Sequence, residues 1–316
     1  MNYIVFDLEW NQPFNCHNRS TSSLPFEIIE IGAVKVSEDF EIVSKFNELV
    51  RPVVYHKINW RTQKMLQLKK GELEKGNYFT KVCRQFLEWC GENPVFCTWG
   101  SQDLTELQRN MAYFKMKPLS EGPIAYLDIQ RLFRLMTDNE QSISLESAVD
   151  SMNVDKVIPF HRAFSDAFYT ARIMEKMGKE NLQGYSFDLY HIPANRKSEI
   201  HYFSGKDYQY ISCAYPERAE ILENRRIMQI NCALCDRKAI RAKIRWFPTP
   251  SKNYYCIGIC KEHGAIKGRL KIRKYEEGKF FADKLLTYVE MDEIDLLREK
   301  KQALKKKKLK EQKEDA

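Results

Sequence analysis

Hydrophobic and polar positions near the N-terminus follow a strand pattern. Apolar residues alternate or run together in segments 3–8, 27–36 and 40–50, which are rich in β-branched and aromatic residues. This pattern predicts three β-strands, and Pro52 closes the third. Because the three segments follow one another closely in sequence, we expect them to pair as an antiparallel meander.

Beyond residue 60 the apolar positions recur with a helical period. A short apolar run at 94–100 predicts one further strand. The amphipathic segments predict helices at 79–90, 102–115, 125–136, 144–152 and 161–177. Ser144 opens the segment SLESAVDSM with the pattern of a helix N-cap. Strands followed by helix, strand and helices predict an α/β domain that ends near residue 180.

The C-terminal part has a different pattern. Residues 181–225 lack clear periodicity and are expected to form a connector with some structure, and residues 226–275 a small basic module. The last segment, 276–316, predicts a helix from 279 that becomes a Lys-rich tail. We therefore expect four parts: 1–180, 181–225, 226–275 and 276–316.

Charge is distributed unevenly along the 316 residues, whose formal net charge is +8. Residues 1–180 hold 22 Lys/Arg and 24 Asp/Glu, so the excess of basic residues lies in the second half, where it would attract a polyanion. No apolar run approaches the roughly 20 residues that a membrane helix needs, so no membrane-spanning segment is expected. The acidic residues of MNYIVFDLEW do not fit a secretory signal, and a cytoplasmic location is expected. No feature indicates the oligomeric state.

Four carboxylates and one histidine form the first group of candidate site residues. Asp7 and Glu9 are two apart on a predicted strand and therefore share a face. Asp103 follows the strand PVFCTWG, and Asp166 follows His161 by five residues at a helix start. Each acid alone has a simpler explanation, since acids at helix N-termini act as caps. The ordered set makes a shared site the better hypothesis.

These motifs resemble the 3′→5′ exonucleases of the DEDD superfamily, in the subtype that carries a histidine. That group includes ribonuclease T, oligoribonuclease and the proofreading subunit of bacterial DNA polymerase III. The resemblance rests on FDLEWN with Asp7 and Glu9, on TWGSQDLTEL with Asp103, and on HRAFSDA with His161 and Asp166. It covers about residues 1–180. It implies a ribonuclease H-like fold, a mixed sheet flanked by helices. DLEWN and WGSQD look most like the exonucleases related to RNA-interference and histone-mRNA trimming enzymes.

The chemistry of such an enzyme suits these residues. Carboxylate oxygens are the ligands that Mg²⁺ and Mn²⁺ prefer, and two such ions stabilise both the attacking and the leaving oxygen of a phosphodiester. His161 is expected to act as general base. The expected function is metal-dependent 3′→5′ hydrolysis of single-stranded nucleic acid ends, with RNA slightly preferred. The alternatives are a DNA proofreading or repair exonuclease and a non-catalytic nucleic-acid-binding protein on the same fold.

Four cysteines and a histidine in the second half form a different group. The pairs Cys232-x2-Cys235 and Cys260-x2-His263 have the spacing of short knuckles that present two ligands to one tetrahedral ion. The module resembles a zinc ribbon, and one structural Zn²⁺ is expected. Cys256 is an alternative ligand, because Cys256-x3-Cys260 would also place two thiolates together.

The basic module is the third candidate, for nucleic-acid binding. Residues 225–274 hold 14 Lys/Arg against two acids, with aromatic residues between them. Trp10, next to the carboxylates, is expected either to stack on a base or to pack in the core. The expected nucleic-acid contacts are Trp10, Arg241, Lys243, Arg245, Trp246, Tyr254 and Tyr255.

Overall fold

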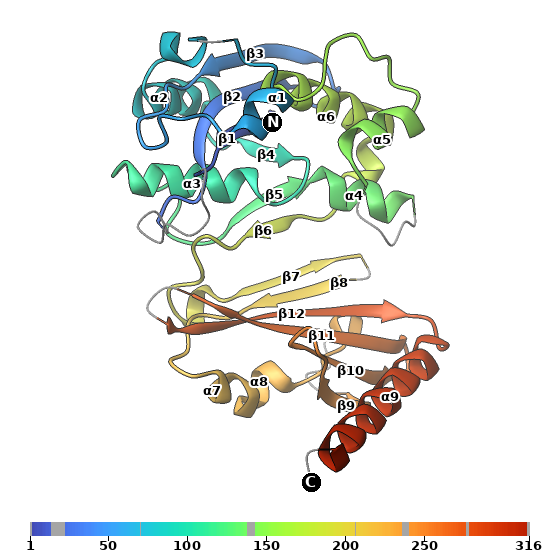
Figure 1. The fold of residues 1–316 in the computed structure, drawn as a ribbon. Coiled ribbons are helices and arrows are strands. Elements are labelled where there is room, and N and C mark those ends of the chain that lie inside the picture. The colour runs from blue at the N-terminus through green and yellow to red at the C-terminus, as the bar shows by residue number, and fades with distance from the viewer. Residues whose placement is uncertain are drawn as a thin grey trace. The chain divides into compact units, whose positions relative to one another are not determined.

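The chain folds into two compact units, residues 1–191 and residues 192–316 (Figure 1). The computed structural model describes residues 2–13, 23–69, 71–137, 143–205, 207–235, 240–275 and 278–314, with side chains as far as Lys307. The first boundary lies at His191 rather than near residue 180, because a further strand after the last helix joins the first sheet.

The first unit is built on a six-stranded mixed sheet in the order β3-β2-β1-β4-β5-β6. Its strands are β1 (Tyr3–Asn11), β2 (Glu27–Val36), β3 (Ile42–Leu49), β4 (Val95–Thr98), β5 (Ile124–Asp128) and β6 (Ser186–Asp188). β1, β2 and β3 pair antiparallel, which confirms the predicted meander. β4 pairs parallel to β1 and β5 parallel to β4, so the sheet is mixed, as the resemblance implied.

Helices cover both faces of this sheet, as Figure 1 shows. The helices are α1 (Trp60–Met65), α2 (Phe79–Cys90), α3 (Asp103–Tyr113), α4 (Ile129–Met136), α5 (Leu145–Ser151) and α6 (Ala163–Met177). One apolar core joins the sheet to α4, α5 and α6, and the other joins it to α2 and α3. The result is the three-layer arrangement expected for a ribonuclease H-like exonuclease fold.

The alternation along β1 decides where the acids point. Val5 belongs to the core with α6, whereas Phe6 belongs to the core with α2 and α3. Because side chains alternate between the faces of a strand, Asp7 and Glu9 continue the row of Val5 toward α6. Two carboxylates on β1 thus face the helix that carries Asp166.

Local predictions in this unit hold except at one segment. The Ser144 side chain accepts a hydrogen bond from the Ser147 amide at 3.1 Å, which confirms the N-cap. The single helix predicted for 125–136 is wrong, because Ile124–Asp128 is a strand. Asp128 ends that strand and also caps α4 through the Arg131 amide at 2.9 Å. With no linker between the two elements, the apolar pattern shows no break.

The second unit is built on another six-stranded sheet, in the order β7-β8-β12-β11-β10-β9. Its strands are β7 (Ile200–Ser204), β8 (Asp207–Ile211), β9 (Arg241–Pro248), β10 (Asn253–Cys260), β11 (Gly264–Lys274) and β12 (Phe280–Val289). Its helices are α7 (Arg218–Glu223), α8 (Arg225–Met228) and α9 (Glu293–Glu314). All neighbouring strands pair antiparallel.

This sheet differs from the expected division of the C-terminal part. Residues 181–225 are not a simple connector, because they supply β6 to the first sheet and β7 and β8 to the second. The helix expected from residue 279 is wrong for Phe280–Val289, a strand that pairs with both β8 and β11. The basic module 226–275 is therefore part of a larger sheet. Sequence periodicity misses this because strand pairing over such distances leaves no local signal.

The two faces of the second sheet are covered differently. One face packs on α7 and α8, with Ile221 and Ile227 buried against Leu270. On the other face, Ile294 and Leu297 of α9 pack against residues of β9 and β10, and Figure 1 shows α9 beside β9. In the part of the chain that the structure describes, no helix combines the length and the apolar character needed to cross a membrane.

Candidate functional site

The predicted carboxylates meet at the ends of β1 and β4. Ligand oxygens of Asp7, Glu9 and Asp166 lie within 4.8 Å of one another. Asp103 is the first residue of α3. Its Oδ1 accepts a hydrogen bond from the Leu8 amide of β1 at 3.1 Å, which holds it beside Asp7 and Glu9. Four acids far apart in the sequence are thus gathered around the carboxyl end of β1, where ligands bind in open α/β sheets.

A glycine on β2 lets α6 approach the sheet at this point. Gly32 lies directly opposite Asp7 in the antiparallel pair. A Cβ at Gly32 would lie 1.9 Å from the backbone nitrogen of Phe164, in the first turn of α6. Only a residue without a side chain permits this close approach. The glycine therefore determines how near Asp166 comes to Asp7.

Burial and mutual repulsion make these carboxylates unusually basic. Burial raises the pKa of Asp7 well above its usual value, and the charges of Asp103 and Glu9 raise it further. Burial, with the charges of Asp166 and Glu30, raises the pKa of Glu9 to about 8. Burial also raises the pKa of Asp103 to about 7 and that of Asp166 to about 6.

Such a cluster is a strong site for cations. Buried carboxylates without cationic partners either hold protons or bind metal ions. The Arg162 charge lowers the pKa of Glu9, yet it does not offset the effect of burial. The donor set is all carboxylate oxygen, which suits Mg²⁺ and Mn²⁺ rather than softer ions. Asp7, Glu9, Asp103 and Asp166 are the residues that would hold them.

His161 stands at the entrance of α6 in an uncommon backbone conformation. Its φ is 64°, in the left-handed region, and it is solvent-exposed. Its backbone amide donates to Asp166 Oδ1 at 3.3 Å. This turn places the imidazole on the rim of the carboxylate cluster, and backbone strain of this kind is concentrated at functional sites.

One cavity of about 490 Å³ contains all five of these residues. Its wall is completed by Leu8, Trp10, Met65, Trp99, Gly100, Ser101, Gln102 and Gln130. The Trp10 ring packs on Phe26 with centroids 5.4 Å apart and also lines the cavity, and its stacking on a base stays a prediction.

The sequence reasoning missed an ion-pair network beside the cluster. Glu30 is opposite Glu9 on β2 and is 1% exposed. Arg162 Nε donates to Glu30 Oε2 at 2.9 Å, and Arg162 also pairs with Glu72 at 3.4 Å. Because Arg162 follows His161 directly, this network anchors the turn that presents the imidazole. The sequence offered one signal for this network: Arg162 directly follows His161, and Glu30 lies within a mostly apolar predicted strand.

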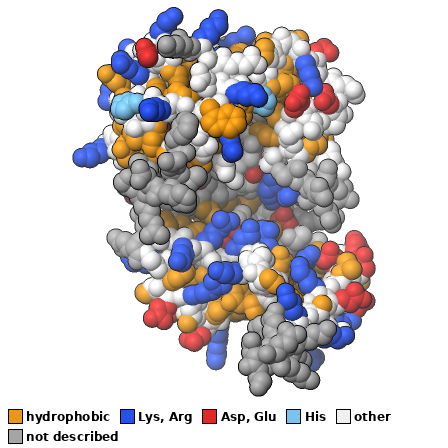
Figure 2. Space-filling view, in the orientation of Figure 1, with side chains coloured by type: hydrophobic (Ala, Val, Ile, Leu, Met, Phe, Trp, Pro, Cys, Tyr) orange, Lys and Arg blue, Asp and Glu red, His pale blue; other side chains and the backbone are white. Residues whose placement is uncertain are grey.

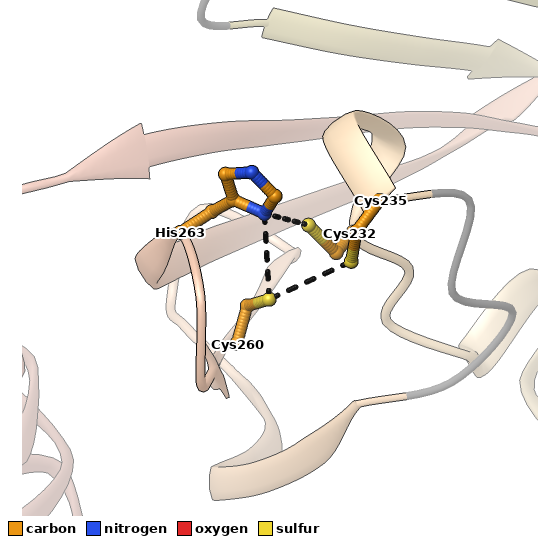
Figure 3. A group of neighbouring side chains, drawn as sticks. All are labelled: Cys232, Cys235, Cys260 and His263. Carbon is orange, nitrogen blue, oxygen red and sulfur yellow. Dashed lines mark hydrogen bonds between the residues drawn. The ribbon is translucent and has the colours of Figure 1, made fainter.

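A second cluster of potential ligands lies in the second unit (Figure 3). Cys232 and Cys235 come from a short turn, and Cys260 and His263 flank the β10–β11 hairpin turn. Figure 3 shows the three sulfur atoms and one imidazole nitrogen pointing toward a common centre. All four ligand atoms lie within 4.8 Å of one another, and the cysteines form no disulfide.

The separations fit a tetrahedral zinc ion. Bonds of about 2.3 Å to sulfur and about 2.0 Å to nitrogen place tetrahedral ligands about 3.8 Å (S···S) and about 3.5 Å (S···N) apart. Cys235 and Cys260 Sγ are 3.7 Å apart, and His263 Nδ1 is 3.4 Å from Cys232 Sγ and 3.7 Å from Cys260 Sγ. The Tyr288 hydroxyl lies 3.2 Å from Cys232 Sγ, as a supporting hydrogen bond to a metal ligand would.

The alternative ligand Cys256 is not part of this cluster. Its side chain is fully buried in the core between Ile230 and Leu286, and its sulfur lies beside Gly268. Burial raises its pKa, which disfavours the thiolate that a metal requires. The structure thus selects His263 rather than Cys256 as the fourth ligand.

The predicted nucleic-acid contacts of the basic module divide into two groups. Arg241, Lys243 and Arg245 are exposed on β9. Trp246 donates from Nε1 to the Met228 carbonyl at 2.6 Å, and Tyr254 packs in the core with α7 and α8. Both rings are half-buried and take part in packing, so their contact with nucleic acid stays a prediction. Figure 2 shows Lys and Arg side chains gathered on the visible face of this unit, with acidic ones near its margins.

One further predicted contact, Tyr255, is half-buried on the opposite face of β10 from Tyr254. Lys300 of α9 lies over its ring at 5.1 Å from the centroid. Tyr255 therefore stays a candidate nucleic-acid contact, and Lys300 of α9 adds a positive charge beside it.

Comparison with known proteins gives one family and a set of structures. The family model described as "RNase_T: Exonuclease" matches residues 4–174. Among solved structures, a full-length 3′-exonuclease is 16% identical over 57% of this chain and 83% of its own, with a TM-score of 0.49. The nuclease domain of 3′hExo, described as a DEDDh family member bound to rAMP, is 17% identical over 57% of this chain and 93% of its own, with a TM-score of 0.49. A structure of exonuclease I is 10% identical over 71% of this chain and 57% of its own, with a TM-score of 0.47. No curated protein sequence gives a significant match.

Proposed function

Because the chain belongs to the RNase_T exonuclease family, we propose that it is a metal-dependent 3′→5′ exonuclease that acts on single-stranded nucleic acid ends. The observation that carries this proposal is the single cavity lined by Asp7, Glu9, Asp103, His161 and Asp166. A non-catalytic protein on the same fold would have no reason to keep four carboxylates together, two of them buried and two half-buried, since their repulsion destabilises the folded state.

The carboxylates and the cavity wall have separate tasks. Two divalent ions held by Asp7, Glu9, Asp103 and Asp166 would supply Lewis-acid stabilisation of the attacking and leaving oxygens of the phosphodiester. The aromatic and apolar wall, with Trp10, supplies a surface on which a terminal base can stack. At about 490 Å³ the cavity is large enough for a terminal nucleotide rather than for a duplex.

We expect His161 to act as general base. It lines the cavity beside the carboxylates, and its exposure would let it pass the proton of an attacking water to solvent. Arg162 fixes the turn through Glu30, so the imidazole is positioned by an ion pair that does not itself touch the substrate.

RNA is the substrate that we propose over DNA. The support is the likeness of DLEWN and WGSQD to the exonucleases related to RNA-interference and histone-mRNA trimming enzymes. Two glutamines and a serine of the cavity wall, Gln102, Gln130 and Ser101, are neutral hydrogen-bonding groups that suit a ribose hydroxyl.

The test compares RNA and DNA oligonucleotides of one sequence, each labelled at the 5′ end. With Mg²⁺ or Mn²⁺ the expected product is a ladder that shortens from the 3′ end, faster for RNA. Asp7→Asn should abolish the ladder, and Asp39→Asn, which changes an exposed acid in a turn, should not. Full activity of a folded Asp7→Asn protein, or loss of the 5′ label as the first event, would refute the proposal.

We also propose that the second unit holds one structural zinc ion through Cys232, Cys235, Cys260 and His263. A site with four protein ligands has no open position for a substrate, so its role is to stabilise the fold. It joins the turn at 232–235 to the β10–β11 hairpin. Elemental analysis should find one zinc per chain.

A further inference from the structure

Four basic side chains form a row along β11. Lys267, Arg269, Lys271 and Arg273 occupy alternate positions of one antiparallel strand. They therefore point to the same face of the second sheet, about 6.8 Å apart along the strand, so that the row extends over about 20 Å. The residues between them, such as Gly268 and Leu270, face the core with α7 and α8.

Only part of this charge is neutralised by the protein itself. Lys267 pairs with Glu293 at 2.7 Å and Arg273 with Asp283 at 3.1 Å. Arg269 and Lys271, in the centre of the row, form no ion pair with the residues that the structure describes. The Arg269 Nε is buried without a hydrogen-bond partner. A buried cationic donor in this state is a site for an anion.

The surroundings of the row are those of a binding groove. A cavity of about 230 Å³ is lined by Tyr255, Lys267, Arg269, Leu285, Thr287 and Val289. Cross-strand pairing places Tyr255 and Leu285 directly beside Arg269, on the same face. α9 packs on this face against residues of β9 and β10 and against Ala265 and Val289 at one end of β11 and β12, and it brings Lys300 over the Tyr255 ring. Basic donors therefore alternate with an aromatic ring and apolar side chains.

We propose that this row binds the sugar–phosphate backbone of single-stranded nucleic acid, with Arg269 and Lys271 as the central phosphate contacts. The regular spacing is comparable to that of successive phosphates in an extended strand, and Tyr255 offers a ring at the side of the row for a base. The inference rests on the proposed function only for its choice of ligand. It differs from the sequence-based expectation, which placed the contacts on β9.

An anionic membrane surface fits the row less well. Arg269 and Lys271 are half-buried, and so are their apolar neighbours Leu285 and Val289. A lipid surface would engage exposed side chains first. A flexible polyanion can follow a strand and enter a groove.

The experiment measures binding of labelled RNA by fluorescence anisotropy as a function of salt, without divalent cations, so that hydrolysis does not occur. The binding constant falls as salt rises, so the slope of log K against log[salt] is negative. Arg269→Gln/Lys271→Gln should make this slope shallower by about 1.4, since each phosphate contact to a single strand contributes about 0.7. The same loss corresponds to about 25-fold weaker binding at 0.1 M salt.

Two further variants make the result specific. Arg225→Gln/Arg226→Gln removes the same charge from α8, on the opposite layer of the sheet, and should leave the slope unchanged. Arg269→Lys/Lys271→Arg keeps the charge and should retain most of the slope. Circular dichroism of each variant reports whether the unit still folds. If the glutamine variant does not fold, the charge-preserving variant is used to test whether the slope depends on positions 269 and 271.

Three results would overturn the inference. These are an unchanged slope in the glutamine variant, an equal loss in the α8 variant, and tighter salt-dependent binding to phosphatidylserine vesicles than to RNA. A chain that binds RNA through the row but degrades no oligonucleotide would refute the proposed function and leave this inference standing. A chain that degrades RNA, but whose salt dependence of RNA binding does not change when Arg269 and Lys271 are replaced, would refute this inference and leave the proposed function standing.

Discussion

Asp103→Asn should make the metal-free protein more stable while abolishing its activity. Asp103 is 6% exposed, and burial raises its pKa from 3.8 to about 7, with the Asp166 charge adding to the effect. A raised pKa means that the folded state holds a proton that the unfolded state has released. The free energy of unfolding therefore falls as the pH rises from about 4 through 7. Asparagine carries no charge and retains an oxygen that can accept from the Leu8 amide.

The size of the effect follows from the two pKa values. Each unit of difference corresponds to about 1.4 kcal/mol. The raised pKa therefore lowers the free energy of unfolding by about 4 kcal/mol at pH 8, where the folded carboxylate is charged, and by about 2 kcal/mol at pH 5, where the folded group takes up a proton that the unfolded chain has released. The variant should exceed the parent in stability by a similar amount, and by more at pH 8 than at pH 5. Mg²⁺ should stabilise the parent more than the variant, because the ion binds only the folded pocket.

The measurement is denaturant unfolding followed by tryptophan fluorescence, at both pH values, after dialysis against buffer free of Mg²⁺ and Mn²⁺. Glu27→Gln is the matched control, since Glu27 is also buried, but its carboxylate accepts hydrogen bonds from the Val53 and Tyr55 amides at 2.6 and 2.7 Å. It should not stabilise the protein. If Asp103→Asn were less stable than the parent at pH 8, the carboxylate would not carry an uncompensated charge, and the reasoning about the metal site would be wrong.

The other predictions concern the base, the zinc site and the fold. His161→Ala should slow hydrolysis by about 10²–10⁴-fold with Mg²⁺ binding retained, and an unaltered pH–rate profile would assign the base to another group. Cys235→Ser should lose the zinc found by elemental analysis, whereas Cys256→Ser should keep it; zinc lost from both would contradict the ligand set. Gly32→Ala should lower the free energy of unfolding by at least about 3 kcal/mol, because its Cβ would meet the backbone of α6, whereas Gly122→Ala, with nothing within 4 Å, should cost little; equal effects would show that the contact is unimportant.

The sequence was sufficient for most elements of the first unit, though not for β5 and β6, because the signals of the others are local. The meander and the amphipathic helices follow from short-range periodicity, and the family model confirms the resemblance that the ordered motifs indicated. The position of the carboxylates was predictable for a different reason. The alternation along β1 places Asp7 and Glu9 on one face, and motif order places Asp103 and Asp166 at helix starts.

What sequence reasoning missed depends on pairing between distant segments. β12 pairs with β8 across more than seventy residues, so neither strand could be assigned to the sheet from its own sequence. The packing of the aromatic residues in the basic module was missed for the same reason. Trp246 is aromatic within a basic stretch, yet its role is set by the Met228 carbonyl that accepts its hydrogen bond. The basic residues of β11 occupy alternate positions in the sequence. Whether they can bind a ligand depends on which face of the sheet is left uncovered, which the sequence does not show.

The distribution of charge gives a physical reason for two separate binding surfaces. Residues 1–191 hold 22 Lys/Arg and 25 Asp/Glu, whereas residues 192–316 hold 29 and 18. Two divalent ions would do no more than neutralise the four carboxylates of the cavity, which leaves little excess positive charge there to attract a polyanion. Salt-dependent affinity for nucleic acid depends on side chains that neutralise phosphates. We therefore expect that affinity to come mainly from the second unit, while the first, on the proposed function, would determine which bond is cleaved. An isolated first unit would then bind long RNA weakly and with a shallow salt dependence, even where its chemistry is intact.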